Sequence, residues 1–260
     1  MIQNVTLVGA GNVAWHLGAA LEDAGLVVDV VYSRNYSNAK ALAERLYDAV
    51  PTDSLDFSES KSELFILMVS DNVVQQVAEE MTLPSSGAIV VHTSGAVPLE
   101  ALANAGLYVG VFYPLQTFSK GKKVDFSKIS ICIDSKSERI LDMLAEMAYK
   151  LSKKVYHLNS EERRKLHVAA VFACNFTNHM MTIAQEVMES NGMHFEMLEP
   201  LVRETVDKAF AIGPDKSQTG PAIRGDSKTI GKHLEELDGK ARYQEIYKLV
   251  SESIAGIEKE

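Results

Sequence analysis

A short glycine-rich segment near the start of the chain has the spacing of a phosphate-binding turn. Gly9, Gly11 and Ala14 stand in the pattern Gly-x-Gly-x-x-Ala, directly after the apolar run Val5–Val8. In such a turn the first glycine permits a tight bend, the second lets the backbone approach a pyrophosphate, and the small third residue allows close packing. The free N–H groups of the helix that follows attract the phosphates. We therefore expect a dinucleotide site, with a glycine turn that serves another ligand as the alternative. The expected cofactor contacts in this segment are Gly9, Gly11, Asn12 and Val13.

The residues after the next apolar run distinguish the two nicotinamide dinucleotides. In NAD-binding domains an acidic side chain at the end of the second strand holds the ribose hydroxyls. Here the run ends at Tyr32 and is followed by Ser33, Arg34 and Asn35, whereas Asp29 lies inside the run. A guanidinium can pair with a 2′-phosphate as a planar fork, and hydroxyl and amide groups can donate to it. We expect NADP as the cofactor, with a solvated loop arginine as the alternative.

Polar residues also follow later apolar runs, and ligands of open α/β sheets bind beyond such strand ends. Ser70 is expected to line the cofactor cleft, whereas Asp71 beside it is expected to cap a helix. His92 and Ser94 follow the run Ala88–Val91. A side chain of either type can supply a proton near the nicotinamide, and a purely structural histidine is the alternative.

Two residues of the second half are candidates for the substrate side of the site. Asn175 lies on a polar face of a long helical pattern, and Arg224 lies in the loop Gly213–Gly225. An amide can orient a substrate, and a guanidinium can hold a carboxylate in a bidentate pair. The alternatives are an asparagine that bridges backbones inside a helix bundle and an arginine that binds a partner subunit. His167 and His179 are twelve positions apart, with no acid to complete a ligand set, so no metal is expected. The expected catalytic set is His92, Ser94, Asn175 and Arg224.

The order of apolar patterns predicts what positions these residues. Short apolar runs alternate with amphipathic stretches up to residue 158, which predicts βαβ units in a Rossmann-type doubly wound parallel sheet. From residue 159 the pattern is helical throughout, so we expect an α/β domain over residues 1–158 and an all-α domain over 159–260. Ser160 and Asp226 are the expected N-caps of two of these helices. The expected helices are Glu161–Ser190, Phe195–Ala211, Asp226–Leu237 and Ala241–Ile257.

The composition excludes several classes of protein. Hydrophobic residues make up 46% of the chain, charged residues 23%, and the net charge is -9, which disfavours disorder and nucleic-acid binding. No apolar run approaches a bilayer span, and the N-terminus lacks the features of a signal peptide. Cys132 and Cys174 lie in apolar runs and are expected to be buried thiols of a reducing compartment. These features predict a cytoplasmic protein that contacts neither membrane nor nucleic acid.

Several longer motifs resemble a known family. They are, in chain order, His92-Thr93-Ser94-Gly95, Tyr113-Pro114-Leu115-Gln116-Thr117-Phe118-Ser119, Asn175-Phe176, Thr219-Gly220-Pro221-Ala222-Ile223-Arg224-Gly225-Asp226 and His233-Leu234. Over almost the whole chain these motifs resemble proteins in which a Rossmann-like domain is fused to a "domain of unknown function 2520". That family is similar to pyrroline-5-carboxylate reductase, to hydroxyisobutyrate dehydrogenase and to deazaflavin-dependent NADP oxidoreductases.

The resemblance implies an NADP-dependent oxidoreductase whose helical domain is similar to that of phosphogluconate dehydrogenase. Such domains form homodimers, and the Met-rich apolar faces of this one are too extensive for about 100 residues to bury alone. Hydroxyacid dehydrogenases of the wider group carry a lysine one helical turn before the asparagine, where this chain has Val171. Imine reduction needs no strong base. We therefore expect hydride transfer between NADPH and a small imino or keto substrate. The alternative is a non-catalytic NADP(H) sensor or scaffold protein on the same fold.

Overall fold

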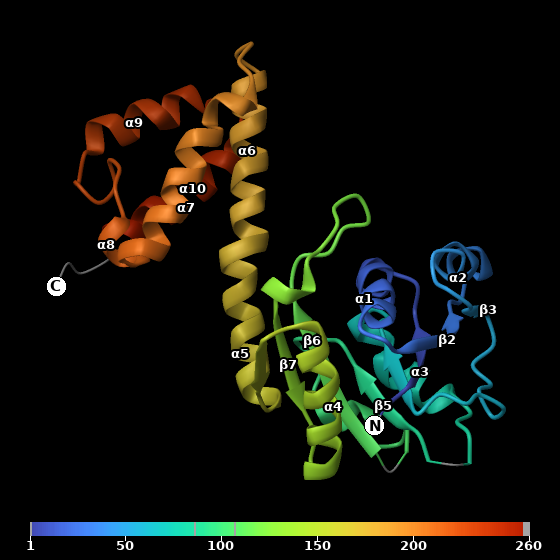
Figure 1. Ribbon diagram of the computed structural model, residues 1–260. Coiled ribbons are helices and arrows are strands. Elements are labelled where there is room, and N and C mark those ends of the chain that lie inside the picture. Colours follow the sequence, from blue (N-terminus) through green and yellow to red (C-terminus); the bar gives the residue numbers. More distant parts are fainter. Residues whose placement is uncertain (1, 86, 107, 257–260) are drawn as a thin grey trace. The chain divides into compact units, whose positions relative to one another are not determined.

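A single sheet forms the centre of the first half of the chain. The computed structural model describes residues 2–85, 87–106 and 108–256, and among these residues the sheet has eight strands in the order β3-β2-β1-β4-β5-β6-β7-β8 (Figure 1). All neighbouring strands are parallel except β6 and β7. The strands are β1 (Asn4–Val8), β2 (Val27–Tyr32), β3 (Val50–Thr52), β4 (Leu64–Leu67), β5 (Ile89–His92), β6 (Tyr108–Leu115), β7 (Ser130–Asp134) and β8 (Lys154–His157).

The order of the first strands confirms the expected Rossmann-type fold. The chain winds outward from β1 through β2 to β3, then returns to the other side of β1 with β4 and β5. The direction of winding therefore changes between β1 and β4, where a crevice opens beyond the carboxyl ends of the strands. Strands β7 and β8 run in the opposite direction to β1–β6 and depart from the expected parallel sheet.

Both faces of the sheet are buried, which explains why its central strands read as unbroken apolar runs. In β4 alternate side chains point to opposite faces, so Leu64 and Ile66 join one core cluster while Phe65 and Leu67 join the other. Each fully buried side chain of this size contributes about 1.5–3 kcal/mol relative to an exposed one.

Helices cover the two faces of this sheet. The clusters place α1 and α4 on one face and α3 on the other. The helices of this part are α1 (Asn12–Asp23), α2 (Tyr36–Ala43), α3 (Val74–Glu80), α4 (Glu138–Leu151) and α5 (Ser160–Ala170), with 3-10 turns at Asp71–Val73, Leu99–Leu102 and Phe126–Lys128.

The N-cap residue of α5 is Asn159 and not the expected Ser160. Asn159 accepts hydrogen bonds from the backbone N–H groups of Glu161 and Glu162, and the Glu162 carboxylate accepts one from Asn159 N. This capping box satisfies the free donors of the first turn. The expectation for Ser160 was wrong because its hydroxyl accepts from Leu99 N at 3.1 Å instead.

The second half of the chain is all-α, as expected. A π-helical turn, Val171–Phe176, precedes its first α-helix, and a 3-10 turn, Phe195–Leu198, begins the second helical segment. Asp226 caps α9, as expected, by accepting from Thr229 N at 3.0 Å. Ile257, the expected last residue of the final helix, lies outside the described residues. The α-helices are α6 (Thr177–Glu189), α7 (Glu199–Ile212), α8 (Pro214–Ser217), α9 (Ser227–Glu236) and α10 (Ala241–Ala255).

By internal packing the chain divides into two units, Met1–Cys174 and Asn175–Glu260. Helix α5 therefore groups with the sheet, later than the expected border at residue 158, because side chains of α5 bind the sheet directly. Contacts within a single chain define compact units but not domains. The domain border at residue 158 therefore remains a prediction. No helix within the described ranges is long and apolar enough to cross a bilayer.

The two cysteines differ in exposure. Cys132 is buried in β7, where burial raises the pKa of its thiol to about 11. Cys174 is exposed in the π-helical turn, so the expectation that both thiols are buried was wrong for this one. An apolar neighbourhood in sequence did not bury it, because the surrounding turn presents its side chains to solvent.

Candidate functional site

The glycine turn between β1 and α1 has the shape of a phosphate cradle. Gly9 has φ +126° and donates from its N–H to Tyr32 O at 2.9 Å. A Cβ at this position would lie 2.4 Å from the carbonyl oxygen of Met68, so only glycine fits. Gly11 forms the N-cap of α1 without a side-chain cap bond, which leaves N–H groups of the first turn free for an anion.

A cavity of about 330 Å³ opens over this turn, between the ends of β1, β2 and β4. Expected cofactor contacts from the glycine turn, from the end of β2 and from the end of β4 all line this cavity. Lining residues that were expected are Gly9, Gly11, Ser33, Arg34 and Ser70, and lining residues that were not expected include Tyr32, Asn38, Gln76 and Glu80.

Three expected contacts lie outside the residues that line this cavity. Asn12 is the first residue of α1, and Val13 packs against the core. The side-chain oxygen of Asn35 is taken by its capping bond from Ser37 N at 3.0 Å. The contact of all three residues with a cofactor remains a prediction. At Asn12 and Val13 we expect that contact to be made by the backbone N–H groups.

Charges of both signs face the end of β2. Burial and the Glu80 carboxylate raise the pKa of Tyr32, while the Arg34 guanidinium opposes them. Glu80 accepts a hydrogen bond from the Gln76 side-chain amide at 2.8 Å, whereas Arg34 is exposed and forms no ion pair within the described residues. Asp29 lies in mid-strand, as the sequence indicates, and its carboxylate accepts from Ser60 Oγ at 3.3 Å.

At the end of β5 the two expected proton donors accept hydrogen bonds that shape the local turn. His92 is 0% exposed, and burial together with the Arg163 charge lowers the pKa of its imidazole to about 4. Its Nδ1 accepts from Ser94 N at 3.2 Å, which shapes the turn after the strand. The Ser94 hydroxyl accepts from the backbone N–H groups of Ala96 and Val97, both at 3.0 Å. Asp71, the expected helix cap, is instead the first residue of the 3-10 turn after β4, and the N-cap residue Ser70 makes no side-chain cap bond.

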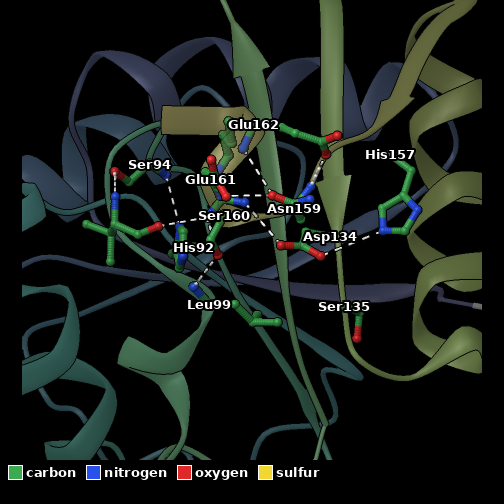
Figure 2. A network of polar contacts seen from close by, with 12 residues as sticks. His92, Ser94, Leu99, Asp134, Ser135, His157, Asn159, Ser160, Glu161 and Glu162 are labelled. Carbon is green, nitrogen blue, oxygen red and sulfur yellow. Dashed lines mark hydrogen bonds and ion pairs between the residues drawn. The ribbon is translucent and has the colours of Figure 1, made fainter. Parts of the chain in front are cut away.

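The turn after β5 lies beside a network of polar contacts that includes Asp134, His157 and Ser160 (Figure 2), and a buried arginine of α5 joins this network to the turn. The Arg163 side chain is 1% exposed and donates to Asp134 Oδ2 at 3.2 Å and to the carbonyl oxygen of Val97 at 2.7 Å. His157 Nε2 lies 3.7 Å from the other oxygen of Asp134. Arg163 Nε and His92 Nε2 are buried without a partner in the described part of the chain. The sequence carries no signal for this network, because Arg163 stands among other charged residues of a helical pattern.

Another pair beside this turn joins β6 to α5. Tyr113 Oη lies 3.2 Å from His167 Nδ1, with the two rings edge to face and 6.3 Å apart. Both rings press on Gly95, where an added Cβ would lie 2.7 Å from His167 Nδ1 and 2.8 Å from Tyr113 Cζ. In the sequence Tyr113 appears only within a motif, and His167 only as half of a rejected metal pair.

Strand register places this pair at the cofactor edge of the sheet. One row of paired residues crosses four strands near their carboxyl ends: Val8, Leu67, His92 and Val111. Two residues beyond that row stand Ala10 in the glycine turn, Ser94 after β5 and Tyr113 in β6. Strands lie about 4.8 Å apart. The Tyr113 position is therefore about 14 Å from the glycine turn, on the side away from Arg34.

The remaining two expected residues belong to the second unit. Asn175 is exposed in the π-helical turn, and Arg224 is exposed in the turn before α9. Each is described within its own unit, so their meeting with His92 and Ser94 stays a prediction.

Comparison with known proteins assigns the family. Residues 2–108 match the family described as a Rossmann-like domain, and residues 129–254 match the Domain of unknown function (DUF2520). No curated protein matches the chain.

Several solved structures share the fold. A Bacteroides fragilis protein named as a candidate NADP oxidoreductase is 37% identical, with a TM-score of 0.88 over 98% of each chain. An imine reductase from Myxococcus stipitatus in complex with NADP+ is 14% identical, with a TM-score of 0.67 over 98% of this chain and 95% of that one. A pyrroline-5-carboxylate reductase from Coxiella burnetii is 16% identical, with a TM-score of 0.60 over 100% of both chains. The last two proteins have low sequence identity to this chain, so their similarity shows a shared fold and nothing more.

The two matched regions and the full-length relative confirm the resemblance found in the motifs. The chain belongs to the family in which a Rossmann-like domain is joined to domain of unknown function 2520, and its structure is related to those of NAD(P)-dependent oxidoreductases.

Proposed function

We propose that this protein is an NADPH-dependent reductase of a small imino or keto compound. The observation that carries the proposal is the cavity over the glycine turn, which joins Gly9 and Gly11 to Ser33 and Arg34. A dinucleotide laid across that turn has its adenosine at Arg34 and its nicotinamide beyond β4 and β5. The relatives named as an NADP oxidoreductase and an imine reductase support the reaction class.

The preference for NADP rests on Arg34 and Ser33. An exposed guanidinium with no ion pair in the described structure is free to bind a 2′-phosphate. Glu80 also lines this cavity, but its carboxylate accepts from Gln76 and belongs to α3 rather than to the end of β2. The acidic residue that NAD-binding domains place at that strand end is absent here.

The protein's own contribution is binding, orientation and proton supply. When bound, the reduced nicotinamide supplies a hydride to the carbon of the substrate double bond. Free N–H groups of α1 hold the phosphates, and Ser70 lines the cleft between them and the nicotinamide end. In this proposal Asn175 orients the substrate and Arg224 binds a carboxylate if the substrate carries one.

Reduction of a double bond fits this chain better than oxidation of an alcohol. Val171 stands where hydroxyacid dehydrogenases of the wider group carry a lysine, so the base that takes the alcohol proton is missing. Of the expected proton donors, His92 is fully buried and the Ser94 hydroxyl is held by two backbone N–H groups. Burial therefore argues for a structural role of His92, the alternative that the sequence left open.

A non-catalytic NADP(H) sensor or scaffold is the second candidate function. The burial of His92 is the observation that favours it, because a sensor needs the cofactor cavity but no proton donor. Cofactor oxidation in the presence of a substrate separates the two functions.

We further propose that the helical unit forms a homodimer in the cytoplasm. Among residues 175–256, Ala222 is the only side chain that is buried. Large apolar side chains at the surface of these helices include Met197, Leu201 and Phe210, the last 90% exposed. A second copy of the unit offers a matching apolar surface, and a stable dimer buries about 1,200–2,000 Å² in total.

The test measures NADPH binding first and turnover second. Calorimetry with the whole protein should detect NADPH, and Gly9→Ala should abolish binding because its Cβ meets the Met68 carbonyl. Gly25→Ala is the matched control, since Gly25 also has positive φ, +82°, but its Cβ meets nothing within 4 Å. Cofactor oxidation is then followed with a panel of cyclic imines, imino acids and keto acids. Binding without oxidation of the cofactor by any of these compounds would favour the sensor.

A further inference from the structure

Tyr113 and His167 form a polar pair that the proposed cofactor contacts leave unused. Both residues are half-buried and come from elements of the same unit, β6 and α5. The Asp71 carboxylate, at the end of β4, acts electrostatically on the Tyr113 hydroxyl. The pair therefore lies where β4, β5 and β6 end, at the edge expected to hold the nicotinamide.

The direction of the hydrogen bond within the pair depends on which imidazole nitrogen carries the proton. Burial above all raises the pKa of Tyr113 to about 12, so its hydroxyl keeps a proton to donate at neutral pH. That hydroxyl can then donate to His167 Nδ1, 3.2 Å away. A neutral imidazole that accepts at Nδ1 carries its proton on Nε2.

The second ring nitrogen of His167, Nε2, lies on the opposite side of the imidazole from Nδ1. No described atom bonds His167 Nε2, and the ring is neither fully buried nor held by an acid in the described ranges. The backbone makes room for the ring, because Gly95 is the position at which any Cβ would displace both His167 and Tyr113. The turn that His92 and Ser94 shape thus supports the pair without supplying the proton itself.

We propose that His167 is the proton donor of the reduction and that Tyr113 is its positioning residue. This proposal rests on the proposed function. The double bond gains a hydride at carbon from the cofactor and a proton at nitrogen or oxygen from Nε2 of the His167 imidazolium, which is left as the neutral imidazole. The imidazole then regains a proton from solvent, so the only net consumption is NADPH and one proton.

The matching substrate class is a small, neutral C=N or C=O compound whose heteroatom can accept a hydrogen bond. The cation that acts electrostatically on Tyr113 is Arg163, which is buried and bound to Asp134. Its guanidinium is therefore not free to hold a substrate carboxylate.

The first test observes the proton directly and needs no substrate. Nitrogen-15 spectra of the whole protein contain seven histidines, and the His167→Gln variant identifies the signal of His167. We expect the wild type to hold the neutral proton on Nε2, and Tyr113→Phe to mix the two tautomers. Tyr149→Phe, exposed on α4, is the matched control. A neutral proton on Nδ1 in the wild type would show that Tyr113 does not donate to His167, and would overturn Tyr113 as the positioning residue.

The second test separates chemistry from binding. We expect His167→Ala to bind NADPH as the wild type does but to lose about 100-fold in kcat, a typical general-acid effect. KM should change little, and added imidazole should restore part of the rate, which a purely structural loss does not permit. Tyr113→Phe should lose about fivefold, the value of one neutral hydrogen bond. His194→Ala, exposed in the second unit, is the control.

The outcomes distinguish this proposal from the function beneath it. Full turnover by His167→Ala, or a loss that imidazole does not relieve, overturns the proton donor and leaves the reductase standing. A wild-type protein that fails to bind NADPH, or that binds it without oxidising it, overturns the reductase and the donor together.

Discussion

The two units of this chain differ in how they keep apolar side chains from water. In the first unit Phe65, Leu7 and many others are fully buried on both faces of the sheet. In the second unit the helices are equally well formed, but Phe210 is 90% exposed and Ala222 alone is buried among its described residues. Helices can satisfy their own backbone bonds anywhere, whereas burial needs a second layer. The first unit has that layer in its own sheet and helices, and in the proposed dimer a second copy supplies it to the helical unit.

The comparison teaches where to expect each kind of function. The first unit can hold a rigid cofactor cradle, because Gly9 and Arg163 sit in a core that fixes their surroundings. The second unit is suited to contacts with another molecule. The predictions below test this difference between the two units, in order of decreasing expected effect.

The self-sufficiency of the first unit depends on its buried ion pair. Arg163→Ala leaves the Asp134 carboxylate, itself 10% exposed, without its charged partner, and breaking such a pair costs about 3–5 kcal/mol. We expect that loss in the unfolding free energy measured with urea. Arg164→Ala, exposed on the same helix, is the control and should change it by less than about 0.5 kcal/mol. Equal stabilities of the two variants would show that α5 is held by other contacts.

The buried imidazole makes the stability of the first unit depend on pH. Because burial lowers the pKa of His92 from 6.5 to about 4, the unfolded chain takes up this proton at a higher pH than the folded one. The contribution is complete above pH 6.5 and is lost as the pH falls toward 4, by about 3 kcal/mol in all. His92→Gln should flatten this part of the curve of unfolding free energy against pH. His194→Gln, which is exposed, should leave it unchanged. A His92→Gln curve as steep as that of the wild type would contradict the shifted pKa.

The exposed faces of the second unit are the test of the dimer. Phe210→Asp should weaken self-association by at least about 2 kcal/mol, or about thirtyfold in Kd, because it removes a large apolar contact. Sedimentation across a concentration series measures this shift. Tyr47→Asp is a closely matched control, since Tyr47 is 91% exposed but lies in the first unit. A wild-type protein that stays monomeric at high concentration would break the contrast between the units.

The smallest expected effect concerns cofactor choice. Arg34→Ala should weaken NADPH binding by about 1.5 kcal/mol, about tenfold, and leave NADH binding unchanged, since only NADPH carries the 2′-phosphate. Calorimetry with both cofactors measures the ratio. Arg139→Ala, an exposed arginine on α4 outside the cavity, is the control. Equal affinities of the wild type for NADPH and NADH would show that Arg34 is a solvated loop residue without a role in cofactor choice.

Much of the fold is determined by patterns local in sequence. Unbroken apolar runs predict the buried strands, and the Gly9–Ala14 spacing predicts the turn, because both depend on a few neighbouring residues. The short edge strand Val50–Thr52 and the reversed direction of β7 and β8 have no such local pattern. Their places follow from pairing with distant strands.

What the sequence by itself determined is therefore the class of the fold, the cofactor edge of the sheet and the all-α second half. Only the tertiary structure decided which polar side chains are buried and which face the cleft. His92 became a core residue because the turn after β5 and Arg163 of α5 lie against its side chain, and His167 met Tyr113 because α5 brings it to β6. The physical reason is distance along the chain: 54 positions separate Tyr113 from His167, and neither residue type carries a periodic signal that reports its partner.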